Sequence, residues 1–131
     1  MTFRGHQGLT VWNRAVDLVE LTYHLSNALR HSGANDVLAD MRRSALSVPS
    51  HLAAGYQTAS TKEYLRHVHA AQLDLARLET QVTILHRLDW ASREDVDDLQ
   101  SLMTHMDYLL RCLERYLMGD SSKLEAGEAP S

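Results

Sequence analysis

Apolar residues recur along this chain at alternating steps of three and four positions, the period of a helix with one buried face. The most regular row lies near the C-terminus and consists of Val96, Leu99, Met103, Met106, Leu110, Leu113 and Leu117. A strict alternation of this kind is typical of a helix bundle with left-handed supercoiling. A second row, one position before three of these residues, widens the apolar face and consists of Leu102, Leu109 and Tyr116.

Two other segments repeat this spacing, so they are also predicted to be bundle helices. The row of the second predicted helix consists of Leu38, Met41, Ala45, Val48 and Leu52. The row of the third consists of Leu65, Val68, Leu75, Val82 and Leu85. Two polar side chains, Gln72 and Glu79, interrupt the third row.

Residues that start and stop helices divide the chain into four predicted helices with short connections. The first runs over 9–31 before Ser32-Gly33, and the second begins at Asn35 or Asp36, either of which can cap it. The predicted ends of the last three helices are Gly55, Leu88 and Met118–Gly119.

Capping residues support the starts of the third and fourth helices. The hydroxyl of Ser60 can accept from the backbone of Glu63 while that carboxylate reaches back, which is a capping box, and Ser92 with Asp95 repeats it. Pro49 lies inside the second helix, where it removes one backbone hydrogen bond. We therefore expect a kink near Pro49.

These elements predict an all-α protein, an antiparallel up-down-up-down left-handed four-helix bundle. With 131 residues the chain is long enough for one core and too short for two. We expect a flexible N-terminus over 1–8, the bundle over 9–118, and a disordered tail over 119–131 that is rich in small and acidic residues.

The first helix is apolar on two sides. One row consists of Val11, Leu18, Leu25 and Leu29, and the other consists of Trp12, Val16, Val19 and Tyr23. A monomeric bundle needs only one apolar stripe on each helix, so the second row either edges a broad core or is covered by another copy. Leu73, Ile84 and Leu88 also lie away from the seam of the third helix. We favour a homo-oligomer with the second row at its interface.

Composition predicts a cytosolic protein. No window approaches 18 consecutive apolar residues, so no membrane span is predicted. The single cysteine, Cys112, cannot form an internal disulfide, which fits a reducing compartment. The net charge is −4, and 11 of the 13 basic residues are arginine, a bias that suits ion pairs, interfaces or phosphate.

The two polar residues in the third row need partners because a carboxylate removed from water must be paired or neutralised. We expect Glu79 to be at least half buried and bonded to an arginine or a helix cap. Antiparallel packing would place Arg42 and Arg43 opposite residues near Gln72. The alternative is an exposed Glu79 that extends past the seam.

No motif in the chain predicts catalysis. The eight histidines lack the spacing of a helical zinc site, since His67 and His69 diverge around the helix axis. Cys112 lies among leucines and is predicted to pack, and no phosphate-binding loop or nucleophile elbow occurs. We therefore predict no enzyme activity, no cofactor, no metal ion and no small-molecule substrate.

A series of short motifs suggests a family. The chain reads Arg42-Arg43, then Ser47-Val48-Pro49, then Ala53-Ala54-Gly55, then Ser60 to Glu63, and finally Leu78-Glu79-Thr80-Gln81. This order resembles the four-helix-bundle family that is encoded in intervening sequences of bacterial 23S ribosomal RNA genes. The resemblance covers Trp12 to Leu117. It implies a bundle with proline inside its second helix, and related bundles form closed rings of five, so it favours a homopentameric scaffold or adaptor.

A nucleic-acid-binding accessory factor is the alternative function. Its candidate phosphate contacts are Arg42, Arg43, Lys62 and Arg66, which could cluster at one end of the hairpin of the second and third helices. The chain is also loosely similar to accessory proteins of diversity-generating retroelements. It departs from the family pattern at His51, Ala54 and Ala59, positions that favour Asn, Glu and a basic residue. The implied partner is RNA, a protein or both.

Overall fold

The computed structural model describes residues 9–30 and 33–125. They form four α-helices, α1 (Thr10–Ala28), α2 (Asn35–Gln57), α3 (Thr61–Arg87) and α4 (Arg93–Glu125), and these residues contain no β-strand. The predicted all-α class with four helices is thus confirmed. None of the described helices has an apolar stretch long enough to cross a membrane.

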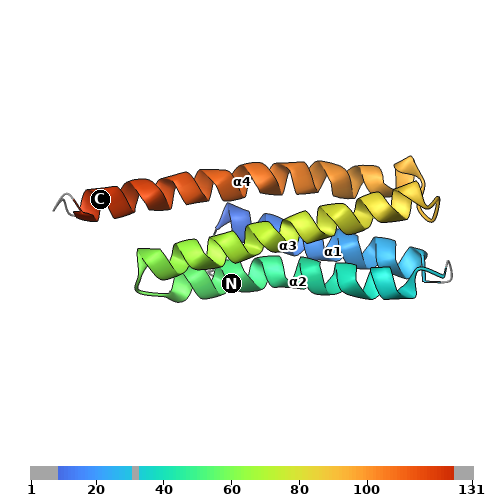
Figure 1. The fold of residues 1–131 in the computed structure, drawn as a ribbon, viewed down its shortest axis with the longest axis horizontal. Helices are drawn as coiled ribbons and strands as arrows, with labels where there is room; N and C mark the ends of the chain where they lie inside the picture. The colour runs from blue at the N-terminus through green and yellow to red at the C-terminus, as the bar shows by residue number, and fades with distance from the viewer. Residues whose placement is uncertain (1–8, 31–32, 126–131) are drawn as a thin grey trace, which may run out of the picture.

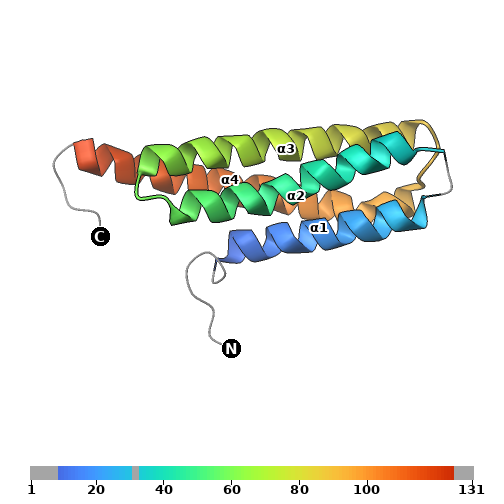
Figure 2. The same cartoon turned by 90° about the horizontal axis from the view of Figure 1, so that it is seen from below.

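Each helix lies beside the next in the chain, and α4 also packs against α1, so the four helices surround one core. Figure 1 and Figure 2 show the chain turning back at each connection. The helices differ in length, from 19 residues in α1 to 33 in α4. In both views α4 extends past the α2–α3 connection, whereas α1 begins part-way along α2.

The predicted apolar rows form this core. All five row residues of α2 are buried, and so are the row residues of α4 except Leu113, which is partly buried. In α3, the row also includes buried Ala71 and Leu78, while Leu65 is only partly buried. The spacing of apolar residues alone therefore predicted which side of α2, α3 and α4 faces inward.

Small and polar residues supply much of the inner face of α1. Ala15, Thr22 and Ser26 are buried there beside Leu18 and Leu25. The Thr22 hydroxyl donates to the Leu18 carbonyl at 2.7 Å, so the fold satisfies this buried donor inside its own helix. Trp12 and Val19 of α1 are partly buried and pack against the edge of this core.

The α3–α4 connection contains a complete cap at each side. The N–H groups of Asp89 and Trp90 donate to the carbonyls of His86 and Leu85 at 3.1 and 3.0 Å, the pattern of a Schellman motif. Asp89 has a φ of 59°, in the left-handed region. After it, Ser92 and Asp95 each accept from the other's backbone N–H, at 3.2 and 3.0 Å.

The caps at the starts of α2 and α3 differ in part from those predicted. At α3 the Ser60 hydroxyl accepts from the N–H of Glu63 at 3.3 Å, but the Glu63 carboxylate accepts from Arg66 at 2.5 Å. The N-cap of α2 is Ala34, not Asn35 or Asp36. Asp36 lies in the first helical turn, where its charge complements the positive helix end.

The predicted ends of α1 and α4 also change. Helix α1 ends at Ala28, and Leu29 caps it by donating to Leu25, whereas the predicted end at His31 lies outside the described residues. Helix α4 continues through Glu125, so 119–125 is helical, contrary to the predicted tail. Residues 1–8 and 126–131 lie outside the described residues. Helix α2 is continuous across the buried Pro49.

Candidate assembly surfaces and polar sites

An apolar groove runs along the outside of α1 and α2. The groove is lined by Trp12, Val16, Val19, Leu46, Pro49, Ser50 and Ala53, and we name these residues the α1–α2 groove. Tyr23 continues the α1 row and is 41% exposed, while Leu46 on α2 is 44% exposed. Three of the predicted interface residues, Trp12, Val16 and Val19, thus share one surface with α2. The sequence had not predicted the contribution of α2.

A second apolar strip lies on the outer side of α3. Its residues recur at helical spacing and include a threonine; they are Leu73, Ala76, Thr80, Ile84 and Leu88, and we name them the α3 strip. Leu73 is 64% exposed and Leu88 is 54% exposed. Single exposed apolar residues are ordinary on protein surfaces, but a strip over four helical turns is typical of a surface that another molecule covers.

Gln72 lies between α3 and α4. Its Nε2 atom donates to the Glu114 carboxylate at 2.8 Å, and His69 Nε2 lies 3.7 Å from the other oxygen of that carboxylate. Both Gln72 and Glu114 are partly buried. The polar interruption of the third row is therefore matched by a polar residue of α4.

Glu79 lies one helical repeat further along the same boundary and is also partly buried. Burial raises the pKa of its carboxyl group, the negative charge of Asp107 raises that pKa further, and the positive charge of Arg111 lowers it. Arg111 itself is paired with Asp107 at 3.1 Å. Glu79 therefore faces α4, near Arg111. Among the described residues its carboxylate forms no ion pair with Arg42, Arg43 or any other arginine.

The four predicted phosphate-binding residues occupy two separate places. Arg42 donates to Ser26 of α1, and Arg43 is paired with Asp40 on its own helix. Lys62 and Arg66 lie in the first turns of α3, where Arg66 is paired with Glu63. Because His51 of α2 meets His67 of α3, the residues opposite the first turns of α3 lie beyond His51, well away from Arg42 and Arg43. The structure does not gather these four residues into one basic patch.

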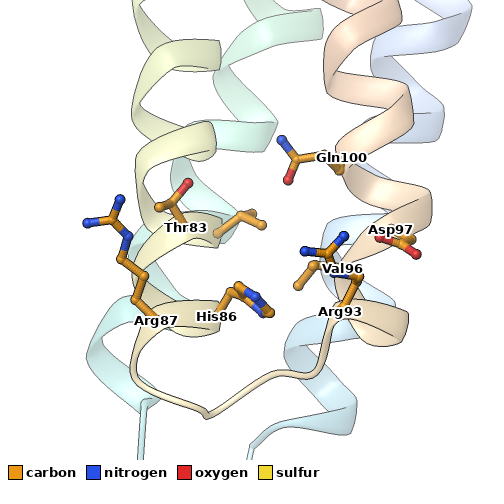
Figure 3. Close-up of a pocket in the computed structure, with 8 residues that line it drawn as sticks. Thr83, His86, Arg87, Arg93, Val96, Asp97 and Gln100 are labelled. Atoms are coloured by element: carbon orange, nitrogen blue, oxygen red, sulfur yellow. The ribbon is translucent and has the colours of Figure 1, made fainter.

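A cleft opens between the C-terminal end of α3 and the start of α4. It has a volume of about 260 Å³ and is lined by Val82, Thr83, His86, Arg87, Arg93, Val96, Asp97 and Gln100. His86, Arg93 and Gln100 lean into the space between the helices, whereas Asp97 points away from it (Figure 3). Within the described part of the chain, Arg87 and Arg93 form no ion pair. The volume is slightly below the usual range for small-molecule pockets.

Two histidines meet across α2 and α3. His51 Nδ1 lies 3.0 Å from His67 Nδ1, and His51 Nε2 lies 3.9 Å from the Asp74 carboxylate. Asp74 is buried and is paired with Arg77 at 3.3 Å. Sequence reasoning tested histidines along single helices and missed this pair, because only the register of two helices brings it together.

The described residues contain no group of three or more His, Cys, Asp or Glu side chains arranged to hold a metal ion. Cys112 is partly buried on α4, and the guanidinium of Arg115 lies 3.7 Å from its sulfur.

The sequence also matches a known protein family. The family model described as 23S rRNA-intervening sequence protein matches residues 7–112, which is most of the chain. The chain belongs to the 23S rRNA-intervening sequence protein family. The resemblance inferred from the short motifs is thereby confirmed. No curated protein matches the chain.

The matched region of this intervening sequence protein includes the whole of α1, α2 and α3 and α4 as far as Cys112. Both apolar surfaces and the histidine pair lie within it. The family match ends at Cys112, whereas α4 continues to Glu125, so the last part of α4 lies outside the match.

Proposed function

We propose that this protein is a non-catalytic scaffold or adaptor that assembles into a homopentameric ring in the bacterial cytoplasm. The observation that carries the proposal is the presence of two separate apolar surfaces on one chain, the α1–α2 groove and the α3 strip. Two different surfaces suit a heterologous interface, in which the strip of one copy fills the groove of the next. Repeating such a contact closes a ring when the rotation between successive copies brings the last copy back to the first.

Burial inside the chain supports the same proposal. Helix α1 buries Ala15, Thr22 and Ser26 together with Leu18 and Leu25, while Trp12 and Val16 remain partly exposed. A monomer gains more from burying large apolar side chains than small ones, at about 25 cal/mol per Å² of apolar area. This arrangement of α1 therefore favours stabilisation by a neighbouring copy.

Light scattering on the purified chain tests the assembly. We expect a particle with the mass of five chains of 14.8 kDa each. Val16→Asp in the groove and Ile84→Asp in the strip should each break the ring, because an interface must desolvate the new charge. Tyr108→Asp is the matched control, since Tyr108 is 61% exposed on α4, outside both surfaces.

Mixing the two charged variants tests which surfaces meet. Each variant keeps one intact surface, so the mixture should form a heterodimer through the strip of the Val16→Asp chain and the groove of the Ile84→Asp chain. Far-ultraviolet circular dichroism checks that both variants remain helical. A stable, unaggregated 14.8 kDa species for the unaltered chain would refute the proposal.

The proposed protomer is an antiparallel, left-handed bundle whose α2 bends near Pro49. The strict alternation of three- and four-residue steps supports the supercoil, and the missing N–H of Pro49 supports the bend. A bend there would also shape the groove, because Pro49 lines it.

RNA binding is the second candidate function, and the cleft between α3 and α4 favours it. Arg87 and Arg93 have no carboxylate partner in the described part of the chain, whereas Arg43 and Arg66 are already paired. An unpaired guanidinium can contact phosphate without first giving up an ion pair. The two arginines of the cleft are therefore better phosphate contacts than Arg43 and Arg66.

A filter-binding assay with structured RNA at low and moderate salt tests this second function. Binding of RNA through the cleft should fall steeply as the salt concentration rises. The double variant Arg87→Gln/Arg93→Gln should bind RNA more weakly. Arg43→Gln with Arg66→Gln is the control pair and should leave RNA binding unchanged. Failure of the unaltered chain to retain RNA at low salt would exclude RNA binding.

A further inference from the structure

The pair formed by His51 and His67 joins α2 to α3, and neither proposed function uses it. The two imidazole rings have centroids 5.3 Å apart and planes inclined by 41°. The side chain of His51 is 34% exposed, and His67 is partly buried. Both rings therefore lie at the surface of the bundle, partly in contact with solvent.

The negative charge of the Asp74 carboxylate lies on the Nε2 side of His51, beyond hydrogen-bond distance. It lies 3.9 Å from Nε2 and favours a proton on that atom. Neutral imidazole carries only one N–H. With that proton on Nε2, Nδ1 of His51 has a free lone pair on the side that faces His67. A carboxylate beside the other ring nitrogen is the usual outer partner of a metal-binding histidine, because it fixes the tautomer and the ring orientation.

We propose that His51 and His67 form a two-imidazole site for a divalent transition-metal ion, bound through the two Nδ1 atoms. Metal–nitrogen bonds of about 2.0–2.1 Å place adjacent ligand atoms about 2.9 Å apart in a square plane and about 3.3 Å apart in a tetrahedron. The observed separation of 3.0 Å lies between these values. When the metal ion binds, the proton on Nδ1 of His67 moves through water to Nε2 of the same ring, so both imidazole ligands remain neutral.

The site supplies two protein ligands, and water completes the coordination sphere. Imidazole suits copper, nickel and zinc, and affinity among divalent ions rises to Cu²⁺ before it falls at Zn²⁺. Because the ligands come from different helices, the bound ion fastens α2 to α3. An ion that binds the folded chain preferentially raises its unfolding temperature according to its concentration relative to the dissociation constant.

Copper titration of the full, metal-free chain tests the site. We expect one Cu²⁺ per chain, an electron paramagnetic resonance spectrum with hyperfine coupling to two imidazole nitrogens, and a higher unfolding temperature. His51→Asn and His67→Asn should each weaken binding at least about tenfold and remove the temperature shift. The matched control is His69→Asn, because His69 is exposed on α3 beside Glu114 and should leave both measurements unchanged.

Unfolding temperatures of the metal-free variants show whether each variant folds. Imidazole nitrogen resonances of the unaltered chain give an independent test during titration with Zn²⁺. Those of His51 and His67 should shift before those of any other histidine. The proposal is overturned if these two resonances stay unchanged at saturating Zn²⁺, or if His51→Asn retains the copper spectrum and the temperature shift of the unaltered chain.

Discussion

At the scale of single residues, the carboxyl group of Glu79 makes stability depend on pH. Burial and the charge of Asp107 raise its pKa in the folded chain above the ordinary value of 4.5. The folded state therefore holds this proton more tightly than the unfolded state, so the free energy of unfolding falls as pH rises through the raised pKa. We expect Glu79→Gln to raise the unfolding temperature at pH 7. The gain in free energy of unfolding should be less than about 1 kcal/mol, because solvent screens the site.

The difference between Glu79→Gln and the unaltered chain should vanish well below pH 4.5, where Glu79 is protonated in the folded and in the unfolded chain. Asp95 provides a contrast of opposite sign, because hydrogen bonds from Ser92 lower its pKa below 3.8. Its contribution is present at neutral pH and is lost as pH falls through the lowered pKa. Thermal unfolding from pH 3 to 8 measures both. A Glu79→Gln variant less stable than the unaltered chain at pH 7 would contradict this account.

Asp89 gives a second prediction at this scale, from backbone geometry. Its φ of 59° lies in the left-handed region, where a Cβ atom is unfavourable and glycine carries no such cost. We expect Asp89→Gly to stabilise the chain by about 0.5–1 kcal/mol, measured by urea unfolding. The reverse change at Gly33, whose φ is 92°, is the control. Gly33→Ala has open space for the added methyl group, so its expected loss of about 1–2 kcal/mol comes from the backbone alone.

At the scale of elements, Gly55 allows α2 and α3 to approach closely. A Cβ atom there would lie 2.8 Å from Cδ1 of Tyr64 and 3.0 Å from Cβ of His67. We expect Gly55→Ala to cost about 1–3 kcal/mol, because relief of this overlap must move α3. Gly119 is the matched control, since it is helical with open space around it, and Gly119→Ala should stabilise by about 0.5–1 kcal/mol. Equal effects of the two changes in urea unfolding would refute a close approach at Gly55.

The sequence predicts which side chains of a helix are buried better than it predicts which adjacent helix each side chain contacts. Helical spacing identified the buried rows of α2, α3 and α4, because burial follows directly from period. It identified Glu79 as a polar interruption of the α3 row but placed it near the arginines of α2, because a row alone does not say which adjacent helix a polar residue faces. The same missing register hid the contact of His51 with His67. Buried Thr22 and Ser26 were missed because small polar residues interrupt an apolar row.

At the scale of the whole molecule, the unequal helix lengths limit what one chain can cover. Helix α1 begins part-way along α2, and α4 extends past the α2–α3 connection (Figure 2). The sequence suggested an uncovered α1 surface from a double apolar row. The groove shared with α2 emerged only from the packing, because Leu46 and Ala53 lie outside the core row of α2.

Coupling between folding and assembly gives a prediction at this scale. If each chain gains stability from its neighbours in a pentamer, a tenfold rise in protein concentration adds about 1 kcal/mol per chain, which raises the unfolding temperature by roughly 4 °C. Differential scanning calorimetry over a hundredfold concentration range measures this slope. Ile84→Asp should remove the slope because the variant unfolds as a separate chain, while Tyr108→Asp should preserve it. An unfolding temperature that stays constant over this range for the unaltered chain would mean that its folding does not depend on neighbouring copies.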